Sequence, residues 1–156
     1  MLPHRTRTAA DANRLLARGV NMGNMLEAPN EGEWGVRIED GYFPLIRQAG
    51  FTAVRIPVRW SAHALADPPY TIDPDFLQRV DHVVRCALRA DLAVVLNVHH
   101  YEELIARPHE HRARFLALWA QLADHYADQP DDLFLELLNE PNGALDDRAW
   151  SALARD

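Results

Sequence analysis

The feature that most constrains the fold of this chain is a repeated alternation of apolar segments and amphipathic segments. Residues 92–98 are almost wholly apolar, as is typical of a parallel strand covered on both faces. Residues 74–90 place apolar side chains on one helical stripe, and Asp73-Pro74 supplies an N-cap followed by proline at the first helical position. Strands that alternate with helices form parallel sheets with right-handed crossovers, so the pattern predicts an α/β fold.

The strand-and-helix unit repeats along the whole chain. We predict strands over residues 19–23, 52–58, 92–98 and 133–138. We predict helices over residues 39–49, 74–90 and 109–127, and a last helix that begins at Asp146-Asp147. No low-complexity segment or linker interrupts the repeat, so residues 1–156 are expected to form a single domain with about four parallel strands.

Composition limits the classes of function. The 156 residues are 48% hydrophobic and 25% charged, which is typical of a globular domain. A net charge of −7 argues against nucleic acid and anionic membrane surfaces as partners. The single cysteine, Cys86, excludes an intrachain disulfide, and we expect a small buried thiol on the apolar side of its helix.

The N-terminal segment bears on localisation. Residues 1–19 contain several arginines and lack the apolar core of a secretory signal, which predicts a cytoplasmic protein. A miscalled start codon would leave the same sequence, and the protein would then be secreted. The chain also contains no apolar run long enough to span a membrane.

Each predicted strand ends in polar residues. In parallel α/β sheets the chemistry gathers at the carboxyl ends of the strands. In this chain those ends carry Asn21 to Glu27, Arg55 with Pro57, His99 with His100, and Asn139 with Glu140. Polar groups thus cluster where this architecture builds a site, and we expect an enzyme.

Glu140 is the central catalytic candidate. A carboxyl group at the end of an apolar strand is expected to be partly removed from water, which favours its protonated form. Such a group can protonate a glycosidic oxygen and later deprotonate water. Asn139 beside it offers an amide to a sugar hydroxyl. The alternative is that Asn-Glu-Pro is only a polar strand exit leading into a turn.

Glu136 lies four residues before Glu140, so on a regular strand both side chains would point to the same side. Their backbones would then be about 13 Å apart. The carboxylates of a retaining glycosidase are about 5–5.5 Å apart, and those of an inverting enzyme about 6.5–9.5 Å. We therefore expect Glu136 to lie inside the fold, paired with a cation such as Arg55. Arg55 could equally orient a catalytic carboxylate.

His99 and His100 are adjacent at a strand end, so we expect their side chains to point to opposite faces and not to form a two-ligand metal site. Contact with sugar is the favoured role, and packing is the alternative. His109 and His111 are expected to be solvated at a helix start. We therefore predict no metal site.

The tryptophans are the other side chains that could contact sugar. Trp34 and Trp60 could each line a groove or simply pack, whereas Trp119 is expected in the core. The chain contains no phosphate-binding glycine loop, Gly-x-Ser-x-Gly elbow or Cys/His cluster in sequence. This argues against nucleotide enzymes and serine hydrolases.

Five stretches together resemble glycoside hydrolase family 5, and look most similar to the bacterial endo-β-1,4-glucanases that also cut mannans. They are residues 18–24, 26–35, 50–60, 98–103 and 137–141, and the resemblance covers nearly the whole chain. It implies retaining hydrolysis of internal β-1,4 bonds of glucans in a (β/α)₈ barrel, with no metal or organic cofactor. It also implies residue roles: Glu140 as acid/base, Asn139 on the sugar 2-hydroxyl, Arg55 supporting the nucleophile, and His99, His100, Asn24 and Glu27 contacting substrate.

The chain departs from the family pattern in length. A (β/α)₈ barrel typically takes about 250 residues, whereas four strands make only an N-terminal half-barrel. The family's nucleophilic glutamate belongs at the end of the seventh strand. Three interpretations follow: the chain is part of an enzyme whose C-terminal half supplies the nucleophile, an inactive half-barrel that binds carbohydrate weakly at most, or a truncated product with no stable fold. Its open sheet edges predict self-association or pairing with a complementing half.

Overall fold

The computed structural model describes residues 7–156, and its centre is one parallel sheet. The strands are β1 (Gly19–Asn21), β2 (Ala53–Ile56), β3 (Ala93–Asn97) and β4 (Leu133–Glu136), in the order β1-β2-β3-β4. The predicted four-stranded parallel sheet is confirmed, although each strand stops one or two residues before its predicted carboxyl end. The start of segment 1–19, on which the localisation prediction rests, lies outside the described residues.

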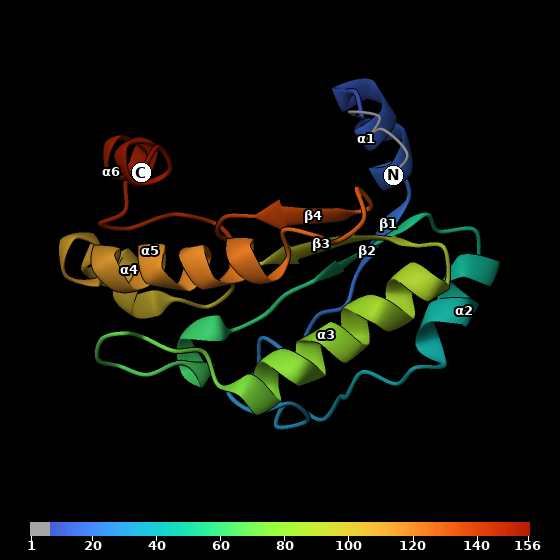
Figure 1. Cartoon of the computed structure of the whole chain (residues 1–156), viewed down its shortest axis with the longest axis horizontal. Helices are drawn as coiled ribbons and strands as arrows, with labels where there is room; N and C mark the ends of the chain where they lie inside the picture. The colour runs from blue at the N-terminus through green and yellow to red at the C-terminus, as the bar shows by residue number, and fades with distance from the viewer. Residues whose placement is uncertain (1–6) are drawn as a thin grey trace.

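Helices connect the strands and lie on both sides of the sheet. They are α1 (Ala9–Leu16), α2 (Tyr42–Gln48), α3 (Pro74–Arg89), α4 (Glu102–Ala106), α5 (Pro108–His125) and α6 (Asp147–Leu153), with a short 3₁₀ helix, η1 (Trp60–His63). Figure 1 shows α2, α3 and α5 along one face of the sheet, and α1 and α6 on the other side. The layer formed by α2, α3 and α5 corresponds to the outer helices of half a barrel wall, with the strands inside it, whereas α1 precedes β1 and α6 follows β4.

Three short helices were not predicted from the sequence. Helix α1 has a capping box in which Thr8 and Asp11 bond to each other's backbone N–H groups. That signal was readable in the sequence, but α1 buries none of its residues. Helices α4 and η1 are four or five residues long, too short to show a helical period.

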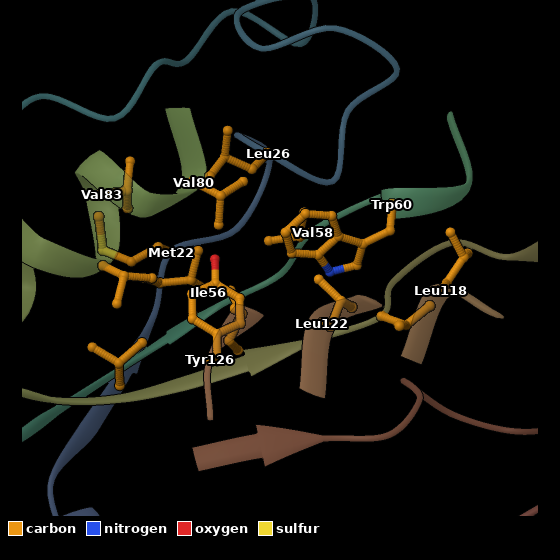
Figure 2. Packing of buried hydrophobic residues seen from close by; sticks show 14 of the residues in the cluster. Met22, Leu26, Ile56, Val58, Trp60, Val80, Val83, Leu118, Leu122 and Tyr126 are labelled. Carbon is orange, nitrogen blue, oxygen red and sulfur yellow. The ribbon is translucent and has the colours of Figure 1, made fainter. Parts of the chain in front are cut away.

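The hydrophobic core lies between the sheet and helices α3 and α5 (Figure 2). Trp60 is fully buried there, and its Nε1 donates a hydrogen bond to the Asn97 carbonyl at 3.0 Å. Packing is therefore its role, and the alternative that Trp60 lines a groove is wrong. Trp119 is only half-buried, and it packs against the core with its Nε1 donating to the Leu137 carbonyl.

Cys86 is half-buried rather than buried, which corrects the prediction. It lies at the flank of the apolar stripe of α3, where the helix surface turns from the core to solvent. Its Sγ is 3.5 Å from His82 Nε2. Burial and the nearby charge of Asp40 raise the pKa of the thiol.

The two edge strands leave part of the sheet uncovered. Leu135 on β4 and Leu137 just beyond it are each 40% exposed, because β4 has no neighbouring strand on its far side within residues 7–156. Edge strands with apolar side chains favour pairing with another chain.

No helix in residues 7–156 has the length and apolar character needed to cross a membrane.

We predict that the 156-residue chain expressed alone self-associates through β1 and β4 or remains partly molten. Light scattering coupled to gel filtration should give a mass above 17.7 kDa, or a broad, noncooperative thermal transition. A monodisperse monomer that melts cooperatively would contradict this prediction.

Candidate active site at the carboxyl ends of the strands

Arg55 on β2 is the centre of the polar network at the strand ends. Its Nε and Nη2 donate to the two carboxylate oxygens of Glu136 on β4, each at 2.7 Å. Its Nη1 donates to Asn21 Oδ1 at 3.0 Å, and its Nη2 also donates to Asn139 Oδ1 at 2.9 Å. The predicted Arg55–Glu136 pair is confirmed, and the guanidinium joins residues from three of the four strand ends.

Asn97 is a member of this network that sequence reasoning missed. It is fully buried on β3, directly beside Glu136 in the sheet register. Its Nδ2 donates to Glu136 Oε1 and lies near His99 Nδ1, each at 3.2 Å. The signal was an amide inside an otherwise apolar strand, because a buried polar side chain needs partners.

The charges of this network stabilise one another. Burial opposes the charge on Glu136, but hydrogen bonds from Arg55 and Asn97 outweigh it and lower the pKa of the carboxyl. The Glu136 hydrogen bond raises the pKa of Arg55 against burial, and the negative charges of Glu140 and Glu27 add to this effect. Glu140 and Glu27 thus act on the same guanidinium, so the candidate residues share one electrostatic site.

Asn139 and Glu140 follow β4 at this end of the sheet. The Asn139 N–H donates to the Val98 carbonyl at 2.9 Å, which ties the two strand ends together. Glu140 is exposed, and its backbone has a φ of 45°. The expected removal of Glu140 from water is therefore not provided by residues 7–156. The regular strand assumed between Glu136 and Glu140 also does not continue to Glu140, since the strand ends at Glu136.

The two strand-end histidines do not lie on opposite faces. Their ring centroids are 4.6 Å apart and nearly perpendicular, which corrects the prediction. The physical reason is that β3 ends at Asn97 and His100 has a φ of 48°, so the alternation of a strand is lost. Trp34, at 43% exposed, lies 5.7 Å from the His100 ring, and these side chains form a half-open aromatic group.

The surroundings of His99 favour its neutral form. Burial lowers its pKa, and the positive charges of His100 and Arg55 lower it further. Its Nδ1 faces the Nδ2 of Asn97. That atom is the amide nitrogen, because it also contacts the Glu136 carboxylate, which only accepts, and an amide nitrogen can only donate. Nδ1 therefore accepts, and the ring proton is on Nε2.

Asn24 and Glu27 lie in the loop after β1. Asn24 is exposed with a φ of 65°, a backbone conformation that asparagine adopts more readily than most residues. Glu27 is only 5% exposed, and its carboxylate accepts the backbone N–H groups of Asn24 and Met25. Glu27 thus closes the loop that presents Asn24.

The described residues contain one group of three side chains with metal-ligand chemistry. It consists of Asp40, His82 and Cys86 on the outer helix layer, and none of these belongs to the strand-end network. The prediction of no metal site considered the histidines at the strand end and the helix start, and not this group, whose members Asp40 and His82 are 42 residues apart in the chain.

Comparison with known proteins identifies the family. A model of the cellulase family, glycosyl hydrolase family 5, matches residues 11–156. The chain belongs to glycosyl hydrolase family 5. This confirms the family resemblance drawn from the five sequence stretches.

Several endoglucanases are similar to this family 5 chain. Endoglucanase H of Acetivibrio thermocellus is 38% identical over 134 residues, which cover 86% of this chain and 15% of that protein. Endoglucanase B of Ruminococcus albus is 31% identical over 163 residues, which cover 96% of this chain and 39% of that protein.

A solved endoglucanase from the hyperthermophile Thermotoga maritima superposes with a TM-score of 0.92 at 56% identity, covering 93% of this chain and 47% of that one. Other structures of that enzyme contain cellobiose or mannotriose. The chain spans about half the length of the solved relatives. Since these relatives are (β/α)₈ barrels, its fold is half of such a barrel, as predicted.

We predict that Arg55→Ala lowers the free energy of unfolding by about 1–3 kcal/mol, because it leaves the half-buried Glu136 without its charged partner. Urea unfolding followed by circular dichroism at a fixed protein concentration measures the change. The matched control is Arg107→Ala, which breaks an exposed pair with Glu110 and should change stability by less than about 0.5 kcal/mol. Equal effects of the two substitutions would contradict the central role of Arg55.

A second prediction concerns acid stability. The folded-state pKa of Glu136 is depressed below its ordinary value of 4.5. Its contribution is therefore fully present above the pKa of the unfolded chain and is lost as pH falls through the folded pKa. Glu136→Gln should show a weaker decrease in stability than the unchanged chain as pH falls below about 5. Parallel pH profiles for the two proteins would show that the Arg55 pair does not stabilise the charged carboxyl.

Proposed function

We propose that this chain forms the acid/base half of a retaining endo-β-1,4-glucanase site, with Glu140 as general acid/base. The observation that carries the proposal is the position of Glu140 just beyond β4, next to Asn139, whose Oδ1 accepts a hydrogen bond from Arg55. In a retaining glycosidase the acid/base first protonates the glycosidic oxygen and then removes a proton from the attacking water. The exposed carboxyl of Glu140 is accessible to a polysaccharide for both steps.

The orientation of Asn139 fits a contact to the sugar. Its Oδ1 accepts from Arg55, which can only donate, so Nδ2 is directed elsewhere and has no partner among residues 7–156. We assign this N–H group to the 2-hydroxyl of the sugar bound at the cleavage point. Hydrogen bonds to that hydroxyl strengthen in the oxocarbenium-like transition state.

Arg55 retains one donor for a further carboxylate. Four of its N–H groups point to Glu136, Asn21 and Asn139. Since a guanidinium has five, one Nη1 N–H is left within the described part of the chain. We propose that it donates to the nucleophilic glutamate, which the segment forming the rest of the barrel would supply.

The remaining candidates surround the path of the sugar. Neutral His99 offers the Nε2 N–H as a donor, and His100 with Trp34 offers ring surfaces against which a sugar face can pack. Asn24 extends from the loop that Glu27 closes, so we propose a direct contact for Asn24 and a positioning role for Glu27.

The substrate class we propose is a β-1,4-linked glucan, with mannan or glucomannan as a further substrate. The names of the curated relatives support a glucan, and the mannotriose complex of the Thermotoga maritima relative supports the wider range. No group in the proposed mechanism needs a metal or organic cofactor.

We predict that the 156 residues alone do not hydrolyse carboxymethylcellulose or glucomannan. Mixing them with a separately expressed C-terminal half of a family 5 barrel should restore release of reducing ends, because that half would supply the nucleophile and cover Glu140. Glu140→Gln should reduce the restored kcat/KM on glucan by at least about a hundredfold, the usual scale of general acid catalysis.

Two controls sharpen this experiment. Glu110→Gln removes an exposed carboxyl on α5 and should leave the restored rate unchanged. An aryl cellobioside with a good leaving group needs little protonation, so Glu140→Gln should slow its first bond cleavage far less than that of glucan. An equal loss on both substrates would overturn the acid/base role. Binding of oligosaccharide without restored hydrolysis would favour the carbohydrate-binding half-barrel instead.

A further inference from the structure

A second cluster of chemically active side chains lies on the outer helix layer. His82 Nε2 is 2.8 Å from Asp40 Oδ1 and 3.5 Å from Cys86 Sγ. One ligand atom from each residue lies within 4.8 Å of the other two. Carboxylate, imidazole and thiolate are the three side-chain ligands typical of zinc sites in proteins.

The fold brings these three side chains together. His82 and Cys86 are one helical turn apart on α3, so they project from the same face of the helix. Asp40 comes from the segment that precedes α2 and is 42 residues away from His82 in the chain. The convergence therefore depends on how this segment is held against α3.

Arg79 holds that segment in place. It lies one turn before His82 on the same side of α3, and its guanidinium binds both carboxylate oxygens of Glu31, at 2.9 and 2.8 Å. It also donates to the Ile38 carbonyl at 2.8 Å, while Glu31 accepts the Ile38 N–H at 3.0 Å. The backbone two residues before Asp40 is thus held against α3, which keeps the Asp40 carboxylate within reach of His82.

Two of the three distances between ligand atoms can be compared with those of a tetrahedral zinc site, and the third, between Asp40 and Cys86, is within 4.8 Å. Zn–N and Zn–S bonds of about 2.05 and 2.3 Å place the nitrogen and sulfur about 3.5 Å apart, as His82 and Cys86 are placed. The nitrogen and oxygen should be about 3.3 Å apart, so the 2.8 Å hydrogen bond to Asp40 must open by about half an ångström. Asp40 is 61% exposed and His82 44%, which leaves room for this shift and for a water ligand.

We propose that Asp40, His82 and Cys86 bind a divalent transition-metal ion, with Zn²⁺ the preferred ion and water the fourth ligand. On binding, the Cys86 thiol gives its proton to solvent and its thiolate bonds to the metal, while neutral His82 donates the Nε2 lone pair. The mixed N, O and S ligands disfavour Mg²⁺ and Ca²⁺, which prefer oxygen ligands alone. The ion would link the segment before α2 to α3, independently of the strand-end site.

Co²⁺ titration of the 156-residue chain tests this proposal. A bound Co²⁺ should give a near-ultraviolet thiolate-to-metal band together with visible bands, and Zn²⁺ should abolish both. Because the chain has a single cysteine, the thiolate band reports on Cys86 alone. Cys86→Ser should remove that band, and His82→Ala or Asp40→Asn should each weaken binding by at least about tenfold.

The matched control is His125→Ala. His125 Nε2 lies 2.9 Å from Asp81 Oδ1, so this pair has the same imidazole and carboxylate but no sulfur. The substitution should leave the thiolate band and the affinity unchanged. A band that persists at full affinity in His82→Ala or Asp40→Asn would overturn the three-ligand assignment.

Alkylation of Cys86 provides a readout that needs no substitution. Saturating Zn²⁺ should slow the reaction of iodoacetamide with the unchanged chain by at least about tenfold, because the lone pair of the thiolate is then engaged with the metal. Far-ultraviolet circular dichroism verifies that the helices remain folded. Absence of protection in the folded chain would overturn the proposal, whatever the behaviour of the variants.

Discussion

The guanidinium of Arg55 is the interaction on which the strand-end site depends. It reaches from β2 across β3 to Glu136 on β4, and it also binds Asn21 at the end of β1. Parallel strands have no turn that links their carboxyl ends, so side chains add to the backbone hydrogen bonds, such as that from Asn139 to Val98, in fixing these ends relative to one another. Arginine suits this task because its planar fork donates in several directions and is always charged. The attraction between the opposite charges of Arg55 and Glu136 offsets the free-energy cost of removing both groups partly from water.

The backbone leaves regular strand geometry at the points where this network meets solvent. Asn24, His100 and Glu140 all have positive φ values, which cost energy for residues with a Cβ. Such conformations gather where the surrounding structure holds them in place and function benefits. Here the holding contacts are the Glu27 carboxylate, which accepts the Asn24 N–H, and the side chains of Asn142 and Ser61, which donate to the carbonyls of Glu140 and His100.

The half-barrel explains why the site is complete on one side only. Helices α3 and α5 cover the outer face of the sheet and bury a core, whereas the face that carries Arg55 and Glu136 is only half-covered. In the (β/α)₈ relatives the matching segment is about half of the chain. The acid/base candidate and the sugar-binding candidates thus share one half, and the proposed nucleophile belongs to the other. The edge strands β1 and β4 are where the two halves would join.

Much of the fold could be predicted because its signals are local. The apolar run of β3, the Asp73-Pro74 start of α3 and the helical stripe of α5 each follow from the order of neighbouring residues. The Arg55–Glu136 pair was also predictable, since two opposite charges inside an apolar sheet require each other. The side-chain alternation of His99 and His100 was not, because it assumed that the strand continued past Asn97.

The sequence by itself therefore determined the α/β class, the four strands and the end of the sheet at which the polar residues gather, because periodicity and strand-end chemistry act over a few residues. Only the tertiary structure decided which of those residues touch. It buried Trp60, joined Asn97 to Glu136 and brought Asp40 to Cys86, since each of these contacts depends on how distant segments pack and not on their order in the chain.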